Sequence, residues 1–162
     1  MHADLGAILE GLITADVKFI LVGGLAAVIQ GAPVTTLDVD IVHDRSAENI
    51  ARLFDFLTSV DAVFRRPDDK TIRPKSEDIS QFVHALLSTR LGPLDVLAMI
   101  EEGKTYNDLI DHTVQIEFRG HILHVLNLET LIRLKKTSKN PKHRQQLPVL
   151  DEALRQIKKR QD

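Results

Sequence analysis

The chain of 162 residues has the length of one ordinary domain, and with 43% apolar and 27% charged residues it has the composition of a globular protein, not a disordered or fibrous one. Its 21 Lys and Arg nearly balance 23 Asp and Glu, which argues against a global positive field for binding long nucleic acid. The absence of cysteine excludes disulfides, thiolate metal sites and a cysteine nucleophile.

The first half of the chain predicts helices and strands in alternation. Apolar residues at helical spacing follow Asp4, a typical N-cap residue, while short apolar runs bounded by turn residues indicate strands. The predicted elements are a helix over residues 5–13, a strand over 18–22, a helix over 25–30, a strand over 37–42 and a helix over 46–60. Gly23-Gly24 separates the first strand from the second helix, and Gly31 ends that helix. This order predicts strand, glycine turn and helix.

The strand at 37–42 carries two carboxylates. With a period of two, Leu37, Val39 and Ile41 share one face, while Asp38 and Asp40 share the other. The two backbone positions would lie about 6.6 to 7 Å apart, and neighbouring carboxylates raise each other's pKa unless a cation lies near. A hard cation such as Mg²⁺ binds carboxylate oxygens together with phosphates, so the pattern favours a metal site for phosphoryl chemistry. The same pattern is also typical of a solvated sheet face.

The second half predicts a polar loop, four strands and two helices. Residues 64–78 are polar and basic, include Pro67 and Pro74 and show no sustained periodicity, which indicates a surface loop or weak edge strand. The strands are 81–89, 92–99, 114–118 and 121–126, and the helices are 128–138 and 141–159, capped by Asn127 and Asn140. The second of these strands contains Asp95 inside an apolar run, which adds a third carboxylate.

The order of these features resembles a known family. The segment Phe-Ile-Leu-Val-Gly-Gly-Leu-Ala-Ala-Val-Ile-Gln-Gly-Ala-Pro-Val-Thr-Thr-Leu-Asp-Val-Asp-Ile-Val, residues 19–42, resembles the signature of the polymerase-beta-like nucleotidyltransferase superfamily. It is especially similar to small bacterial members related to abortive-infection and toxin–antitoxin nucleotidyltransferases. The likeness continues more loosely through residues 92–97, Asn127-Leu-Glu-Thr-Leu-Ile-Arg-Leu-Lys-Lys and the following Asn-Pro-Lys, and so covers roughly half the chain.

The resemblance implies a fold. The expected class is α/β (α+β), with the mixed β-sheet of the minimal nucleotidyltransferase fold, flanking helices and a C-terminal helical pair. We expect a single domain over residues 1–162, in which 1–126 form the catalytic core and 127–162 form the C-terminal helices. One sheet face should carry all three carboxylates, with the helices that begin near Leu25 and Ser46 packed behind it.

The resemblance also implies residue roles. Asp38 and Asp40 would ligate two divalent ions, Mg²⁺ or Mn²⁺, and Asp95 would ligate the catalytic ion and help to activate the attacking hydroxyl. The backbone of Gly23 and Gly24 would approach the triphosphate of an NTP substrate. The nucleotide-binding residues implied in this way are Gly23, Gly24, Thr36, Lys135 and Lys142.

Each of these residues has a simpler interpretation. The glycines also fit a tight strand-to-helix turn, Asp95 an exposed position on an edge strand, and the two lysines a solvated helix face. The basic loop that contains Arg65 is interpreted as solvated rather than as a guide for RNA, because acidic residues dilute it and only 4% of the chain is aromatic. His43 is interpreted as a surface residue, since the histidines show no metal-ligand spacing.

The leading functional hypothesis is an enzyme that transfers a nucleoside monophosphate from NTP to an acceptor hydroxyl on tRNA, other RNA or a protein, in a toxin–antitoxin setting with a cognate partner. The alternative is a catalytically weakened relative that acts as a partner-binding or regulatory module. Val34 favours the alternative, because many relatives carry an Arg at this position.

Two further features bear on location. The beginning of the sequence lacks the basic start and the small-residue cleavage site of a signal peptide. The longest apolar stretch, residues 19–29, is interrupted by glycines and is shorter than the roughly 20 residues of a membrane helix. We therefore expect a cytoplasmic protein without a membrane partner.

Overall fold

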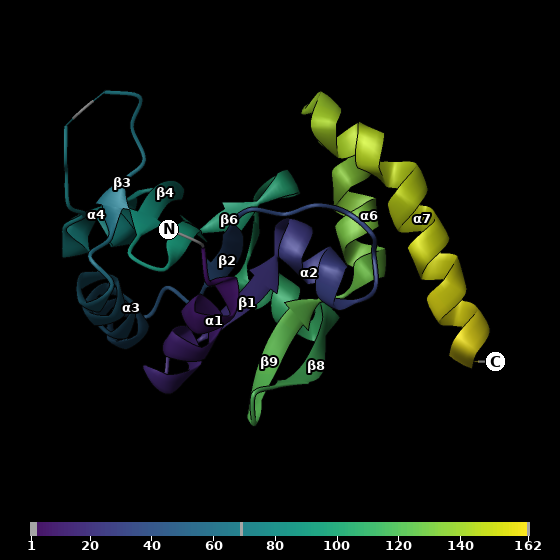
Figure 1. Ribbon diagram of the computed structural model, residues 1–162, viewed down its shortest axis with the longest axis horizontal. Helices are drawn as coiled ribbons and strands as arrows, with labels where there is room; N and C mark the ends of the chain where they lie inside the picture. The colour runs from purple at the N-terminus through teal and green to yellow at the C-terminus, as the bar shows by residue number, and fades with distance from the viewer. Residues whose placement is uncertain (1–2, 69, 162) are drawn as a thin grey trace.

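The protein is described by a computed structural model that covers residues 3–68 and 70–161 (Figure 1). Residues 1–2, 69 and 162, which fall at the ends of the predicted domain and in the predicted loop, lie outside the described residues. Within the described part, seven strands form a sheet in the order β3-β4-β5-β2-β1-β9-β8. These strands are β1 (Phe19–Val22), β2 (Val39–His43), β3 (Val63–Phe64), β4 (His84–Thr89), β5 (Gly92–Leu97), β8 (Thr113–Phe118) and β9 (His121–Leu126).

The sheet is mixed, as predicted. Strand β2 runs parallel to β5, and β1 runs parallel to β9, while the other neighbours are antiparallel. The parallel register places Asp40 directly beside Asp95, and the antiparallel register of β4 places Leu86 opposite Asp95. Because side chains alternate along a strand, the buried Leu94 and Val96 point to the opposite face. The sheet therefore presents both carboxylates on one face, with apolar residues on the other.

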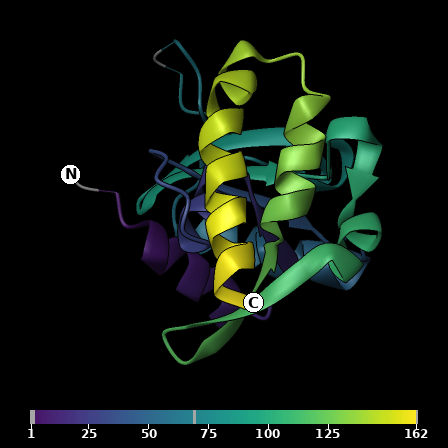
Figure 2. The ribbon, with the colours of Figure 1, turned by 90° about the vertical axis from the view of Figure 1, so that its right-hand side faces the viewer.

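The helices are arranged around this sheet (Figures 1 and 2). They are α1 (Leu5–Thr14), α2 (Gly23–Ile29), α3 (Ala47–Ser59), α4 (Ser76–Gln81), α5 (Tyr106–Leu109), α6 (Leu128–Lys136) and α7 (Pro141–Gln161). Helix α1 contacts α3 and strands β2, β5 and β9, and α6 runs beside α7, the pair that Figure 2 shows in front. One apolar core extends from Ile8 on α1 to Leu150 on α7. No helix in residues 3–68 and 70–161 has both the length and the hydropathy of a membrane span.

The two elements that surround the carboxylates begin at other residues than predicted. Helix α2 begins at Gly23, so the glycines form its first turn and not a separate turn before it. The predicted end of that helix is confirmed by Gly31, which follows with a φ of 101°. Strand β2 begins at Val39, so Asp38 precedes the strand. Leu37 is 76% exposed and does not join the apolar face, which corrects the prediction.

The middle of the chain contains elements that the sequence pattern did not predict. After the two-residue edge strand β3, the loop leads into α4, where a loop and the start of a strand were predicted. The Asp78 carboxylate accepts a hydrogen bond from the backbone N–H of Lys75 at 2.8 Å, and Ile79 is buried, so a cap and one core contact hold this helix. Between β5 and β8 lie further short elements: β6 (Met99–Ile100), η1 (Glu101–Gly103), β7 (Lys104–Thr105), α5 and η2 (Ile110–His112).

The hairpin and the C-terminal helices agree closely with the prediction. Strands β8 and β9 meet at Arg119 and Gly120, both of which have positive φ. The Asn127 side chain accepts a hydrogen bond from the backbone N–H of Thr130 at 2.8 Å, so it caps α6 as expected. Helix α7 begins at Pro141 and continues through Pro148.

Candidate active site

Three aspartates meet on the carboxylate-bearing face of the sheet. One carboxylate oxygen each from Asp38, Asp40 and Asp95 lies within 4.8 Å of the others. Strands β2 and β5 supply Asp40 and Asp95 through their parallel register, whereas Asp38 reaches the cluster from the segment just before β2. Oxygen ligands at this spacing suit a hard divalent cation such as Mg²⁺ or Mn²⁺. The three residues that the sequence placed on one face could therefore hold such a cation.

The cluster is electrostatically unfavourable on its own. Burial, followed by the charges of Asp38 and Asp95, raises the pKa of Asp40 to about 8. Burial and the charge of Asp95 also raise the pKa of Asp38. A bound cation would favour the ionised forms of these carboxylates, which supports the fit of this site to a metal ion.

The guanidinium group of Arg65 contacts this cluster. Its Nη2 donates to Asp95 Oδ1 at 2.7 Å and to the carbonyl oxygen of Leu87 at 2.7 Å. The Asp95 side chain is 13% exposed and that of Arg65 is 36% exposed. The positive charge of Arg65 opposes the increase in pKa at both Asp38 and Asp40. Arg65 is exposed, in keeping with the predicted solvated loop, but its pairing with Asp95 was not predicted.

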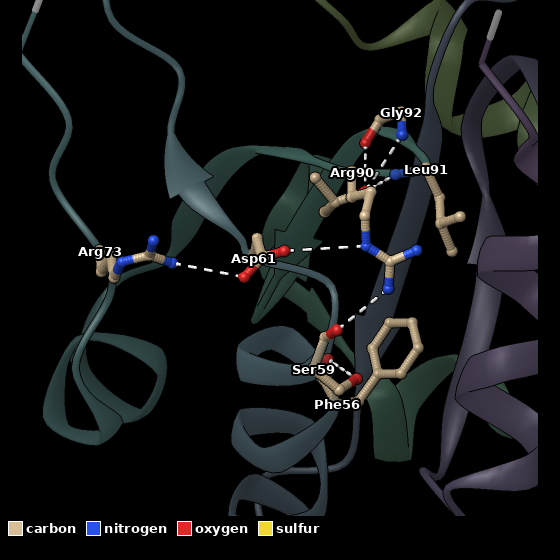
Figure 3. Close-up of polar contacts among 8 residues, drawn as sticks. Phe56, Ser59, Asp61, Arg73, Arg90, Leu91 and Gly92 are labelled. Atoms are coloured by element: carbon tan, nitrogen blue, oxygen red, sulfur yellow. Dashed lines mark hydrogen bonds and ion pairs between the residues drawn. The ribbon is translucent and has the colours of Figure 1, made fainter.

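The segments around Arg65 and Asp95 are joined by a small ion-pair network (Figure 3). Asp61 follows α3. Its Oδ1 lies 3.9 Å from Nη1 of Arg73 in the loop, and its Oδ2 lies 3.7 Å from Nε of Arg90 in the β4–β5 turn. Arg90 also donates to the carbonyl oxygen of Ser59 at 3.2 Å. Because these side chains are well exposed, the network contributes little to stability, but it joins the loop to the hairpin that carries Asp95.

The start of α2 fits closely against the carboxylates. Gly23 has a φ of 74°, and a Cβ at this position would collide with the Asp40 carboxylate. A Cβ on Gly24 would lie 3.1 Å from Thr36 Oγ1, and that hydroxyl donates to the carbonyl oxygen of Asp38 at 3.2 Å. Gly23, Gly24 and Thr36 are therefore placed beside the cluster, and glycine is required at the first of them.

A cavity of about 640 Å³ opens beside the cluster, lined in part by Gly23, Asp40 and Asp95. Lys135 of α6 also lines it, is only 7% exposed and donates to Gln146 Oε1 at 3.0 Å. Burial lowers the pKa of Lys135, while the negative charges of Glu101 and Asp40 oppose that decrease. Of the two lysines singled out in the sequence, Lys135 therefore reaches the cavity. Lys142 is exposed and lies outside the set of residues that line it.

Other cavity residues were not found by sequence reasoning. His143 lines the cavity near Glu101, with its Nδ1 2.7 Å from Ser138 Oγ and 3.6 Å from Glu101 Oε1. The sequence offered one indirect signal, the Asn140-Pro141 helix start that turns α7 back toward α6. No spacing rule links His143 to Glu101, because their contact depends on the tertiary fold.

His43 and Val34 were also singled out in the sequence. His43 is fully buried at the end of β2, its Nδ1 lies 3.2 Å from the carbonyl oxygen of Asp44, and its Nε2 has no hydrogen-bond partner among the described residues. The interpretation of His43 as a surface residue is therefore wrong. Val34 is partly buried and packs against the hydrophobic core.

The fold of this protein is similar to the folds of several solved structures. The lincosamide antibiotic adenylyltransferase LnuA, bound to lincomycin, superposes with a TM-score of 0.61 at 13% identity, over 94% of this chain and 99% of that one. The antibiotic-resistance factor ANT(2″)-Ia superposes with a TM-score of 0.55 at 11% identity, over 92% of this chain and 83% of that one. A Thermotoga maritima protein classed as a nucleotidyltransferase superposes with a TM-score of 0.52 at 19% identity, over 78% of this chain and 77% of that one. No protein-family model and no curated protein matches the sequence. The predicted nucleotidyltransferase fold is confirmed.

Proposed function

We propose that this protein is a divalent-metal-dependent nucleotidyltransferase that transfers a nucleoside monophosphate from an NTP to an acceptor hydroxyl. The observation that carries the proposal is the cluster of Asp38, Asp40 and Asp95 beside a cavity, on the fold of solved nucleotidyltransferases. The close packing of Gly23 on Asp40 supports it, because this contact places the first turn of α2 beside the carboxylates.

The proposed reaction is a single displacement at phosphorus. The acceptor oxygen attacks the α-phosphorus, the bond from that phosphorus to the α–β bridging oxygen breaks, and pyrophosphate leaves. Asp38, Asp40 and Asp95 would hold the divalent ions, and Asp95 would also accept the proton of the acceptor hydroxyl. When bound, the ions neutralise the charge that develops on the attacking and leaving oxygens. Residues 1–162 would carry this activity as one domain.

Binding of the triphosphate would fall to residues around the polar part of the cavity. The proposed contacts are the backbone N–H groups of Gly23 and Gly24, the Thr36 hydroxyl and the Lys135 ammonium group. Lys135 would supply positive charge where Val34 provides none. Its burial supports this role, because a buried ammonium group needs a negatively charged neighbour, and Asp40 and Glu101 supply only part of that compensation.

A binding module without catalysis is the second candidate, and Val34 favours it because its side chain packs against the core and carries no charge. The toxin–antitoxin setting and a cognate partner rest on the sequence resemblance alone, and a cytoplasmic location is also part of the proposal.

Label transfer separates the two candidates. The full-length protein is incubated with each α-labelled NTP, Mg²⁺ or Mn²⁺, and total RNA, protein or small-molecule extract. We expect metal-dependent labelling that Asp38→Asn/Asp40→Asn abolishes and that Asp111→Asn, at an exposed acid in the turn before β8, leaves intact. If the folded wild-type protein neither labels an acceptor nor binds any NTP with Mn²⁺, the enzyme proposal fails and the binding module is favoured.

A further inference from the structure

Exposed apolar side chains stand beside the carboxylate cluster. Val83 and Leu86 are each 45% exposed, and together with Leu97 they line the cavity. We call these three residues the apolar wall. Leu86 lies opposite Asp95 in the register of β4 and β5, and directly opposed residues have their Cβ atoms about 4.5 to 5.5 Å apart. Single exposed apolar side chains are common on protein surfaces, but these line a cavity beside the carboxylates, where a bound molecule would cover them.

The cavity has two chemically different sides. Along the sheet the order is β4, β5, β2 and β1, so Leu86 lies on one side of Asp95 and Asp40, and Gly23, which follows β1, lies on the other. Lys135 of α6 also lines the cavity, as do Asn140 and His143. On this side His84, which is opposite Leu97, also lines the cavity, and Arg65, whose backbone N–H donates to the carbonyl oxygen of Leu86 at 2.9 Å, is paired with Asp95.

The geometry of an in-line displacement indicates which side of the cavity binds pyrophosphate and which side binds the acceptor. In an in-line displacement, the attacking oxygen and the leaving pyrophosphate lie on opposite sides of the α-phosphorus. Pyrophosphate needs hydrogen-bond donors and positive charge, which Gly23 and Lys135 offer on one side, whereas Arg65 on the other side is paired with Asp95. The acceptor must then approach from the side of β4, past Leu86.

We infer that the apolar wall binds the acceptor, and that this acceptor is a small hydroxyl-bearing molecule with an apolar body and not RNA. This inference rests on the proposed function. An RNA acceptor requires basic side chains for its phosphates and aromatic faces for its bases. Beside the wall, the Arg65 guanidinium is already paired with Asp95. The neighbouring Phe82 packs against Phe64 with ring centroids 5.7 Å apart.

The test uses a probe with both parts of the expected acceptor. Octyl β-glucoside, below its micelle-forming concentration, is titrated into full-length protein with Mn²⁺ and a non-hydrolysable NTP, and binding is followed by NMR. Methyl β-glucoside carries the same sugar without the long chain and serves as the matched probe. We expect saturable binding of the octyl compound and at least about tenfold weaker binding of the methyl compound.

Two serine substitutions localise the binding. Leu86→Ser should weaken binding of the octyl compound by about five- to tenfold, because it removes the apolar wall side chain directly opposite Asp95. Ile122→Ser is the matched control, since Ile122 is also exposed, at 54%, but lies on β9 outside this cavity. It should leave the affinity unchanged. Because both side chains are exposed, both variants should remain folded.

The outcomes separate the acceptor assignment from the proposed function. If wild-type protein does not bind the NTP with Mn²⁺, the proposed function fails whatever the glucoside does. If the NTP binds but Leu86→Ser and Ile122→Ser affect the glucoside equally, only the acceptor assignment is overturned. Metal-dependent labelling of tRNA that Leu86→Ser does not reduce would overturn it as well, in favour of an RNA acceptor.

Discussion

Replacing Arg65 by Gln removes the guanidinium that donates to Asp95 Oδ1 at 2.7 Å, and with it the positive charge paired with the carboxylate cluster. A hydrogen bond to a charged group contributes about 1.5 to 3 kcal/mol, and at 36% exposure solvent screening lowers the expectation to about 1 to 2 kcal/mol. The metal-free variant should therefore unfold at a lower temperature at alkaline pH, by roughly 2 to 8 °C for a chain of this size.

The assay is thermal unfolding with EDTA at about pH 8 and about pH 5.5. The decrease in unfolding temperature should be smaller at the lower pH. There the raised pKa values of Asp38 and Asp40 leave fewer negative charges for Arg65 to compensate. Saturating Mn²⁺ should reduce the difference between variant and wild type, and Arg65→Lys should recover part of it. Arg66→Gln, which breaks an ion pair with Asp68 at the surface, is the control. Equal effects of the two Gln variants, or a loss that Mn²⁺ does not change, would refute the reasoning.

Three other substitutions or conditions test the site. Mn²⁺ affinity, measured by calorimetry, should increase from about pH 6 to about pH 8, because binding displaces the proton that burial and neighbouring carboxylates retain on Asp40; a flat profile would contradict this. Gly23→Ala should lower the free energy of unfolding in denaturant by about 1 to 3 kcal/mol and should weaken Mn²⁺ binding. Gly31 has a φ of 101° and open space around the position of a Cβ, so Gly31→Ala should affect stability alone. Lys135→Met should weaken NTP binding about ten- to a hundredfold at fixed Mn²⁺, and Lys142→Met, at an exposed position, should not.

The part of the site that the sequence predicted depends on short-range patterns. The period-two alternation around Asp40 and the apolar neighbours of Asp95 are local properties of each strand, and they placed both carboxylates on one face correctly. The glycine pair marked the end of β1 and the start of α2, because few residues other than glycine can adopt the φ of 74° found at Gly23. The start of β2 was misjudged because the apolar Leu37 extends the alternation without being buried.

The part that the sequence did not predict depends on contacts between distant segments. Arg65 and Asp95 are 30 residues apart, and the loop around Arg65 has no pattern that indicates its partner. Lys135 has the spacing of an ordinary helix residue, and its burial depends on the tertiary packing of α6, which contacts α7, α2 and η1. Helix α4 was missed for another reason. It is six residues long with one buried residue, Ile79, so its apolar periodicity is too short to recognise.

The retained proton and Arg65 together indicate how metal and nucleotide bind. With the pKa of Asp40 raised to about 8 and Arg65 paired with Asp95, the metal-free cluster carries less negative charge than three ionised aspartates would. A cation alone must displace that proton, whereas a cation that arrives with a triphosphate gains extra oxygen ligands and negative charge. Mn²⁺ should therefore bind more tightly with a non-hydrolysable NTP present, and the NTP should gain the same factor from Mn²⁺, because the coupling is reciprocal. Calorimetric titrations in both orders measure that factor, and equal Mn²⁺ affinities with and without the nucleotide would show that the triphosphate does not reach the carboxylates.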